Sequence, residues 1–154
     1  MTSVIRGSDN LDSKYVAKPP ICRAYLSANQ AISANVYVKI AFNTIDFDPD
    51  NIFNVSSNQL EPTVAGWYDV SCYIEGEYAS TRLILRATKN GTDSYMMNET
   101  LLSSNGNGVS ASMIMYFNGT TDWLELDTYI TGTNPTIKSG IDRTNITAVL
   151  LRAN

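Results

Sequence analysis

From Ile21 onward, short runs of β-prone residues alternate with turn signals, and no stretch repeats apolar residues with the period of a helix. The runs cover residues 21–26, 35–42, 59–64, 66–76, 81–88, 93–102, 109–117, 122–130 and 145–151. Between them lie segments rich in Gly, Pro, Asn and Asp, such as DPDN, KNGT, SSNGNG and GTNPT. About nine or ten strands at this spacing predict an all-β sandwich or barrel.

The predicted strands differ in whether one face or both faces are apolar. Residues 82–87 and 122–130 alternate between apolar and charged positions, which predicts strands with one face in water. Residues 66–74, 112–117 and 145–151 instead carry apolar side chains at both alternating sets of positions. Because a sandwich core covers only one face of each sheet, the second face of these strands needs another partner. We expect further copies of the same chain to cover it.

Composition restricts the classes of function. The chain has 154 residues, enough for one domain with a core, and a formal net charge of −4. It contains no run of Lys or Arg, so nucleic acid is not an expected partner. The apolar runs are too short to span a membrane, and the opening residues lack the apolar core of a secretory signal. We therefore expect neither membrane insertion nor export by the usual route.

Residues that commonly carry chemistry are scarce. The absence of histidine excludes His-based acid/base catalysis, Ser-His-Asp triads and most zinc sites. Asp46, Asp48 and Asp50 alternate as in a calcium loop. Asn51 and Ser57 stand where such a loop needs Gly and Glu, so the pattern favours a turn. No two carboxylates stand out as a glycosidase pair, and we expect no catalytic residue, no metal site and no cofactor.

The two cysteines, Cys22 and Cys72, each lie in an apolar segment. We expect buried thiols that pack as small hydrophobic side chains. A disulfide stays open as an alternative for an oxidising compartment, because the sequence does not place the two sulfur atoms.

One set of spaced residues around Gly66 resembles a known signature. Its members are Phe42, Asp48, Phe53, Leu60, Gly66, Tyr68, Val70 and Cys72. The spacing is similar to that of the jelly-roll superfamily formed by the globular head of complement subcomponent q and the tumour necrosis factors. That signature has Phe at the positions of Leu60 and Val70 and an aromatic residue at Cys72, and all three replacements are apolar. The resemblance implies a jelly-roll sandwich of about ten antiparallel strands that forms a compact homotrimer.

The resemblance also implies which side chains face the core and which face neighbouring chains. Tyr68, Val70 and Cys72 would lie in the core, and the residues interleaved with them would point toward the three-fold axis. The side chains facing other copies would be Trp67, Asp69, Ser71, Tyr73, Ser112, Ile114, Tyr116, Ile146, Ala148 and Leu150. This division agrees with the strands that are apolar on both faces.

The opening residues, MTSVIRGSDNLDS, resemble the start of small bacteriophage structural proteins, with neither a signal peptide nor a collagen-like stalk. Phage fibres and tail tips often carry this jelly roll as a knob. The resemblance therefore implies a virion protein made in the host cytoplasm, a trimeric tail-fibre or head-fibre knob without enzymatic activity. Residues 1–20 would be an extended anchor that docks on another virion protein. Residues 21–154 would form the knob that contacts the host cell surface.

Adhesion to the host would use surface loops held by the rigid sandwich. The candidate receptor residues lie in Asn-rich turns and are Asn105, Asn107, Asn118, Thr120 and Asn134. The TGTNPT segment that holds Asn134 and the KNGT turn are the weaker candidates. They could recognise a host glycan or protein, although Asn-Gly turns are also good connectors by themselves. Two alternatives stay open: an adaptor or decoration protein with no receptor, and an enzyme that depolymerises cell-surface polysaccharide.

Overall fold

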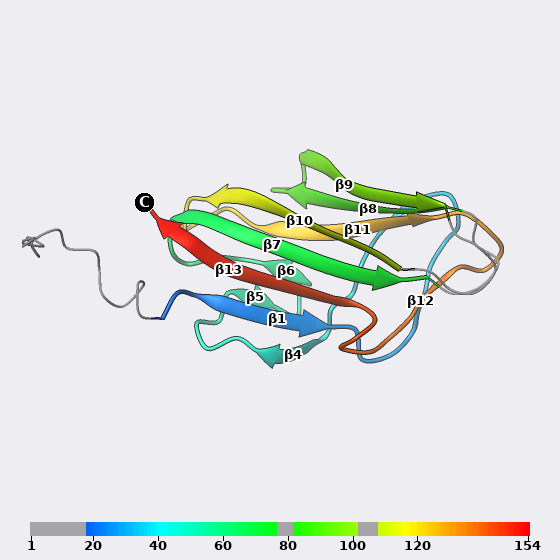
Figure 1. Ribbon diagram of the computed structural model, residues 1–154, viewed down its shortest axis with the longest axis horizontal. Helices are drawn as coiled ribbons and strands as arrows, with labels where there is room; N and C mark the ends of the chain where they lie inside the picture. Colours follow the sequence, from blue (N-terminus) through cyan, green and yellow to red (C-terminus); the bar gives the residue numbers. More distant parts are fainter. Residues whose placement is uncertain (1–17, 77–81, 102–107) are drawn as a thin grey trace, which may run out of the picture.

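The computed structural model describes residues 18–76, 82–101 and 108–154, which form an antiparallel all-β sandwich (Figure 1). One layer, which we call the β7 sheet, contains in spatial order β10 (Gly108–Phe117), β7 (Gly66–Glu75), β13 (Asn145–Ala153), β1 (Ile21–Tyr25) and β4 (Thr44–Phe47). The other layer, the β8 sheet, contains β5 (Phe53–Asn54), β6 (Gln59–Leu60), β11 (Leu124–Ile130), β8 (Arg82–Lys89) and β9 (Asp93–Leu101), with β3 (Tyr37–Lys39) also paired to β11. A small separate sheet pairs β2 (Gln30–Ala31) with β12 (Thr136–Ile137).

The structure confirms the predicted all-β fold and locates the long strands where the sequence pattern indicates them. The strands that the pattern misses are short: β2, β5 and β12 have two residues each, too few to show a period of two, and β4 has four. Within the predicted run 59–64, the strand itself covers Gln59–Leu60. Within the predicted run 35–42, the strand itself covers Tyr37–Lys39. Among the described residues, no helix is long and apolar enough to cross a membrane.

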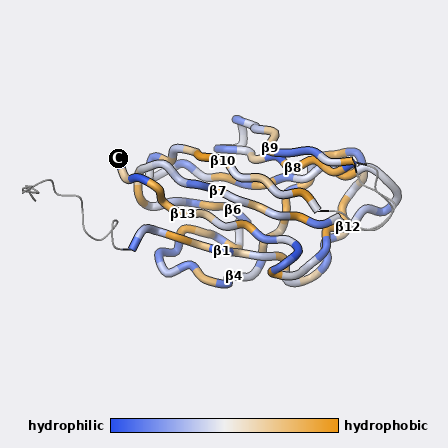
Figure 2. The backbone as a smooth tube through the Cα atoms, viewed as in Figure 1, coloured by the Kyte–Doolittle hydropathy of each residue, from blue (hydrophilic) through white to orange (hydrophobic). Residues whose placement is uncertain are grey.

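The core lies between the two sheets. Figure 2 shows apolar and polar positions alternating along the long strands. In β7 the inward side chains are Tyr68, Val70, Cys72 and Ile74, all buried. The Tyr68 ring packs edge-on against Phe117, with 5.5 Å between the ring centroids. The residues interleaved with this inward set are therefore left on the outside of the sandwich.

Gly66 begins β7 because the neighbouring strand leaves no space for a side chain. A Cβ at this position would overlap the backbone oxygen of Arg152 and a methyl group of Leu150. The pairing between β7 and β13 shifts its register between Leu150 and Arg152, which brings the two backbones together there. The requirement for glycine in the signature thus has a local steric cause.

Asp48 lies outside the core and closes the loop before β5. Its two carboxylate oxygens accept hydrogen bonds from the backbone N–H groups of Ile52, at 2.9 Å, and Phe53, at 2.8 Å. Asp46 lies instead 3.9 Å from a guanidinium nitrogen of Arg23. Among the described residues, no three His, Cys, Asp or Glu side chains gather where they could hold a metal ion. The DPDN segment is therefore built as the turn that its sequence favours.

The outer face of the β8 sheet is more covered than the alternating pattern predicts. Arg86 Nη2 lies 3.0 Å from Asp127 Oδ2, and the Thr88 hydroxyl donates to the same oxygen at 2.7 Å. The Tyr37 ring of β3 lies 3.7 Å from the Arg86 guanidinium carbon. The prediction of a face in water for residues 122–130 is wrong at Asp127, which is 5% exposed, because the Arg86 and Thr88 side chains of the neighbouring strand β8 bond to its carboxylate.

Both cysteines are buried and unpaired. Cys22 belongs to β1 and Cys72 to β7, and β13 lies between these strands. Burial, helped by the charge of Asp48, raises the pKa of the Cys22 thiol to about 12, and burial raises the pKa of Cys72 as well. Two protonated thiols packed in a core agree with the role expected from the sequence.

The two ends of the sandwich differ in which loops they carry (Figure 1). At the end that we call the terminal end, Pro20 accepts a hydrogen bond from Leu150 N at 2.9 Å, and Asn154 N donates to Ala65 O at 3.0 Å. The loops 61–65 and 118–123 lie at this same end. The opposite end, which we call the far end, carries the loops 131–135 and 138–144 together with β2 and β12. The chain thus enters and leaves the sandwich at one end.

Candidate self-association surface

The outward side chains of β10, β7 and β13 form one continuous surface, which we call the outer β7 face. The strand registers align its residues in four rows across the sheet. The rows are Tyr116–Trp67–Arg152, Ile114–Asp69–Val149, Ser112–Ser71–Thr147 and Ser110–Tyr73–Asn145. Side chains in a row are cross-strand neighbours, so the face is apolar near the terminal end and polar but mostly uncharged toward the far end.

The apolar part of the outer β7 face is exposed in the isolated chain. Trp67 is 47% exposed and Ile114 is 61% exposed. The Trp67 and Tyr116 rings pack at a steep angle with their centroids 5.6 Å apart. These side chains also line a shallow hollow of about 250 Å³ at the β10 edge, together with Tyr95 and the stem of Lys89. Large exposed aromatic and aliphatic side chains in contact with one another mark an interaction surface.

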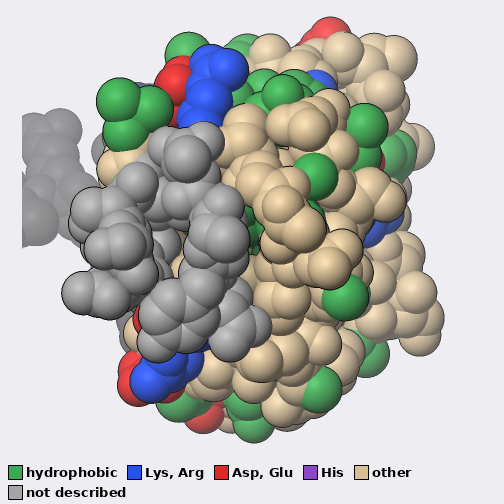
Figure 3. Space-filling model, turned by 90° about the vertical axis from the view of Figure 1, so that its right-hand side faces the viewer, with side chains coloured by type: hydrophobic (Ala, Val, Ile, Leu, Met, Phe, Trp, Pro, Cys, Tyr) green, Lys and Arg blue, Asp and Glu red, His purple; other side chains and the backbone are tan. Residues whose placement is uncertain are grey.

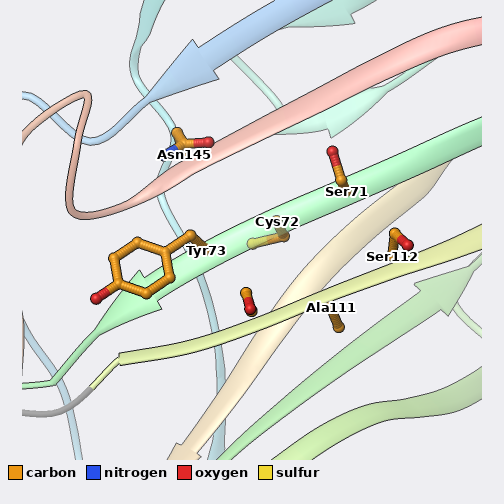
Figure 4. A pocket seen from close by; sticks show the side chains of 7 residues that line it. Ser71, Cys72, Tyr73, Ala111, Ser112 and Asn145 are labelled. Carbon is orange, nitrogen blue, oxygen red and sulfur yellow. The ribbon is translucent and has the colours of Figure 1, made fainter.

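The polar part is a shallow depression of about 400 Å³ (Figure 4). Its small outward side chains are Ser71, Ser110 and Ser112, and its rim carries Tyr73 and Asn145. The Tyr73 ring lies directly over Gly108, where a Cβ would overlap the ring. Partial burial and the charge of Glu75 raise the pKa of the Tyr73 hydroxyl, which keeps it neutral.

Few charges interrupt the outer β7 face. Among the described outward residues of its three strands, Asp69, Glu75 and Arg152 are charged. Glu75 is already paired with Lys138 at 3.0 Å and Arg143 at 3.1 Å. The described side chains in the depression are mainly hydroxyl and amide groups. With few charges to desolvate, this surface is suited to contact with another protein surface.

Seven of the predicted interface residues lie on the outer β7 face: Trp67, Asp69, Ser71, Tyr73, Ser112, Ile114 and Tyr116. Ile146, Ala148 and Leu150 do not; they are 1%, 0% and 5% exposed and belong to the core. Their assignment to an interface is wrong because Ala148 pairs with Val70 and Leu150 with Tyr68, which places all of them on the inward face. The residues of β13 on this face are Asn145, Thr147, Val149 and, past the register shift, Arg152.

The core motif residues Phe42, Phe53, Leu60, Gly66, Tyr68, Val70 and Cys72 are all buried. The candidate receptor residues are not brought together. Asn118 and Thr120 lie at the terminal end, whereas Asn134, with a φ of 49°, lies in a far-end loop. Asn105 and Asn107 lie outside the described residues.

No family model matches the sequence, and no curated protein matches it. Solved structures do match the fold. The globular domain of zebrafish complement 1qA protein is 14% identical, covers 88% of this chain and 99% of its own, and has a TM-score of 0.65. Murine APRIL at pH 8.0 is 9% identical, with 87% and 100% covered and a TM-score of 0.68. Eiger TNF from S. frugiperda is 11% identical, with 88% and 95% covered and a TM-score of 0.60. The chain therefore has the jelly-roll fold of complement 1q and tumour-necrosis-factor-like proteins, as its signature predicts.

Proposed function

We propose that this chain is a non-enzymatic structural protein of a bacteriophage virion, a homotrimeric knob of a tail or head fibre that contacts the host cell surface. The observation that carries the self-association is the outer β7 face, where Trp67 and Ile114 are exposed and few charges would be desolvated on contact. The phage setting is supported by the resemblance of the opening residues to small phage structural proteins. The number three is supported by the resemblance of the Gly66 signature.

A trimer around the outer β7 face would use the apolar rows of the surface. Val149 and Ile114 flank Asp69 in one row, and Trp67 and Tyr116 pack together in the next. A rotation that closes after three copies buries the same residues in each chain and leaves no free interface. Such closure would cover the outward apolar side chains of β7 and β10, whose inward side chains already lie in the core.

The position of the terminal end supports an orientation for the knob. Residues 1–20 would attach to another virion protein, and the described chain enters the sandwich at Pro20, beside the C-terminus. The far end would then point away from the particle. Figure 3 views this end and shows mostly uncharged side chains and backbone among its described residues, with charged groups near the rim. Loops of this kind offer hydrogen-bonding groups at a low cost of desolvation, and Asn134 lies in one of them.

The first test is the mass of the purified chain by sedimentation, for which we expect a trimer. A chain that stays monomeric at the highest soluble concentration would overturn the proposal.

The second test compares particle incorporation of the full chain with that of a chain starting at Pro20, which we expect to trimerise without being incorporated. Adsorption of the purified trimer to host cells separates an adhesion knob from an adaptor or decoration protein. Release of reducing sugar from host polysaccharide would instead identify a depolymerase.

A further inference from the structure

A second hollow, which we call the end pocket, lies at the terminal end. It has a volume of about 380 Å³, within the range of about 300–1,000 Å³ that is usual for small-molecule sites. One wall is formed by Glu61, Pro62 and Thr63, between β6 and β7. The other wall is formed by residues 119–123, between β10 and β11. None of these lining residues belongs to the outer β7 face, so a trimer formed through that face does not use them.

The loop that forms the second wall is held in one conformation by its own side chains. Asn118 Oδ1 accepts hydrogen bonds from the backbone N–H groups of Thr120, Thr121 and Asp122, at 2.9, 2.9 and 3.1 Å. Asn118 Nδ2 donates to the Thr121 hydroxyl at 2.8 Å. Gly119 has a φ of 75°, and a Cβ there would lie 2.5 Å from Ala65 N, so the two walls meet at this glycine. A pocket built in advance avoids the entropy cost of ordering loops when a ligand binds.

Trp123 supplies the aromatic surface of the end pocket and is fixed from behind. Its backbone N–H donates to Asn90 Oδ1 at 2.9 Å, and its carbonyl accepts from Asn90 N at 3.0 Å. A Cβ at Gly91 would lie 3.4 Å from the indole ring, so the KNGT turn packs against this side chain. The turn therefore holds the backbone of Trp123 and packs against one side of its indole.

The polar groups of the pocket select the charge of the ligand. Glu61 accepts hydrogen bonds from Ser57 at 2.9 Å and Asn54 at 3.4 Å, and it has no ion-pair partner among the described residues. The Asp122 carboxylate is paired with Lys89 at 2.8 Å, so Glu61 leaves the pocket with a net negative charge. Phosphate, sulfate and acidic sugars would be repelled, whereas a carboxylate readily accepts hydrogen bonds from neutral hydroxyl groups.

We propose that the end pocket binds a small neutral saccharide. The C–H face of a sugar ring would pack on Trp123, and its hydroxyl groups would donate to Glu61 and exchange hydrogen bonds with the hydroxyls of Thr63 and Thr120. An apolar ring wall combined with a few oriented hydroxyl and carboxylate groups matches the two-sided character of a pyranose. Two residues of the predicted receptor set, Asn118 and Thr120, thus belong to this site, one shaping the loop and one lining the pocket. The inference goes beyond the proposed function, because the site lies away from the far-end loops and does not depend on trimer formation.

The chain has two tryptophans, so the variant Trp67→Phe leaves Trp123 as its single indole fluorophore. We would titrate this variant with glucose, galactose, mannose and N-acetylglucosamine at millimolar concentrations, and record saturation transfer from the protein to the sugar C–H protons by NMR. We expect a change in Trp123 emission and saturation transfer for at least one of these sugars. Sodium sulfate and sodium phosphate should give neither signal.

Two variants locate the binding. Thr63→Arg places a long side chain at an exposed position of the pocket mouth, and Trp123→Ala removes the stacking surface. We expect each to weaken sugar binding by about tenfold or more. Should Trp123→Ala fail to fold, Thr63→Arg alone decides, since it alters no buried residue. Ile114→Asp should bind sugar like the wild type even when it no longer self-associates.

The inference is overturned if the folded wild type binds no neutral sugar, or if binding survives Thr63→Arg unchanged. A response to sulfate or phosphate in place of neutral sugars would also refute it, because the charge argument would then be wrong. Loss of trimerisation with sugar binding intact would count against the proposed function alone.

Discussion

Ile114→Asp tests the outer β7 face most directly. Ile114 lies in an apolar row on the edge strand β10, opposite Asp69 on β7, and 61% of its surface is exposed. Full burial of an isoleucine side chain stabilises by about 1.5–3 kcal/mol, so the exposed part offers about 1–2 kcal/mol to an interface in each chain. Over three chains the substitution removes about 3–6 kcal/mol. It also adds a carboxylate beside Asp69 that must be desolvated, at a cost of several kcal/mol per chain.

The same substitution should hardly affect the isolated fold, because an exposed strand position contributes about 1 kcal/mol or less through its propensity. We therefore expect sedimentation velocity to show a trimer for the wild type and a folded monomer for Ile114→Asp. Val55→Asp is the matched control, since Val55 is 38% exposed in the turn between β5 and β6, away from the outer β7 face. A variant that is folded and still trimeric at the wild-type concentration would refute the assignment of this face.

Three further outcomes follow from local geometry. Gly119→Ala should destabilise the fold by more than Gly91→Ala in thermal melts. Both glycines have positive φ, a conformation that costs an alanine about 1–2 kcal/mol, but only at Gly119 would the added Cβ also meet a neighbouring backbone. Cys22 and Cys72 should react with a thiol reagent only after unfolding, because burial raises the pKa of both thiols; labelling of the native chain would contradict this. Burial alone would raise the pKa of Asp122, but hydrogen bonds from Lys89, Asn90 and the Asn118 backbone, together with the charge of Lys89, lower it below its ordinary value of 3.8. The stabilisation from this carboxylate is therefore present above that pH and is lost as pH falls through the folded value. Asp122→Asn should thus be less stable than the wild type at neutral pH, with the difference vanishing in acid.

The sequence predicts the faces of β7 but not those of β13. In β7 the Gly66-x-Tyr68 spacing identifies which alternate positions are buried, and the structure places Trp67 and Tyr73 on the opposite face. In β13, apolar residues occupy both sets of positions, so a period of two gives no preference between Ala148 and Val149. Only the pairing of Ala148 with Val70 decides, and this is a contact between residues far apart in the chain.

The abundance of asparagine has a partly local explanation. In the described part of the chain, five asparagines have positive φ, namely Asn35, Asn51, Asn58, Asn90 and Asn134. Asparagine tolerates this left-handed conformation better than other side chains, and it supplies a side-chain carbonyl to the turn that follows. Many of the asparagines are therefore explained by the conformation of the turns in which they lie. For this reason a high Asn content is not by itself an argument for receptor binding.

The end pocket could not be predicted from the sequence, because its walls come from two loops separated by more than fifty residues. The Asn118 turn is recognisable as a rigid connector, but nothing near it in the chain indicates that Glu61 and Thr63 lie opposite. The contact depends on the crossing from β6 to β7 lying beside the crossing from β10 to β11, a property of the sandwich topology. Local sequence patterns identify single strands and turns, but they do not show which loops lie side by side in the folded sandwich.

Lys89 joins the two surfaces that the structure singles out. Its ammonium group donates to the carbonyl of Tyr116, on the outer β7 face, at 2.8 Å, and pairs with Asp122, in the loop of the end pocket, at 2.8 Å. The Lys89 and Asp122 side chains are 16% and 12% exposed, so removing the lysine charge would leave a largely buried carboxylate unpaired. The cost would fall on the pocket loop, whereas the carbonyl of Tyr116 would lose one hydrogen bond. Lys89 therefore supports the shape of the end pocket more than that of the outer β7 face, and the two surfaces share a support without sharing a lining residue.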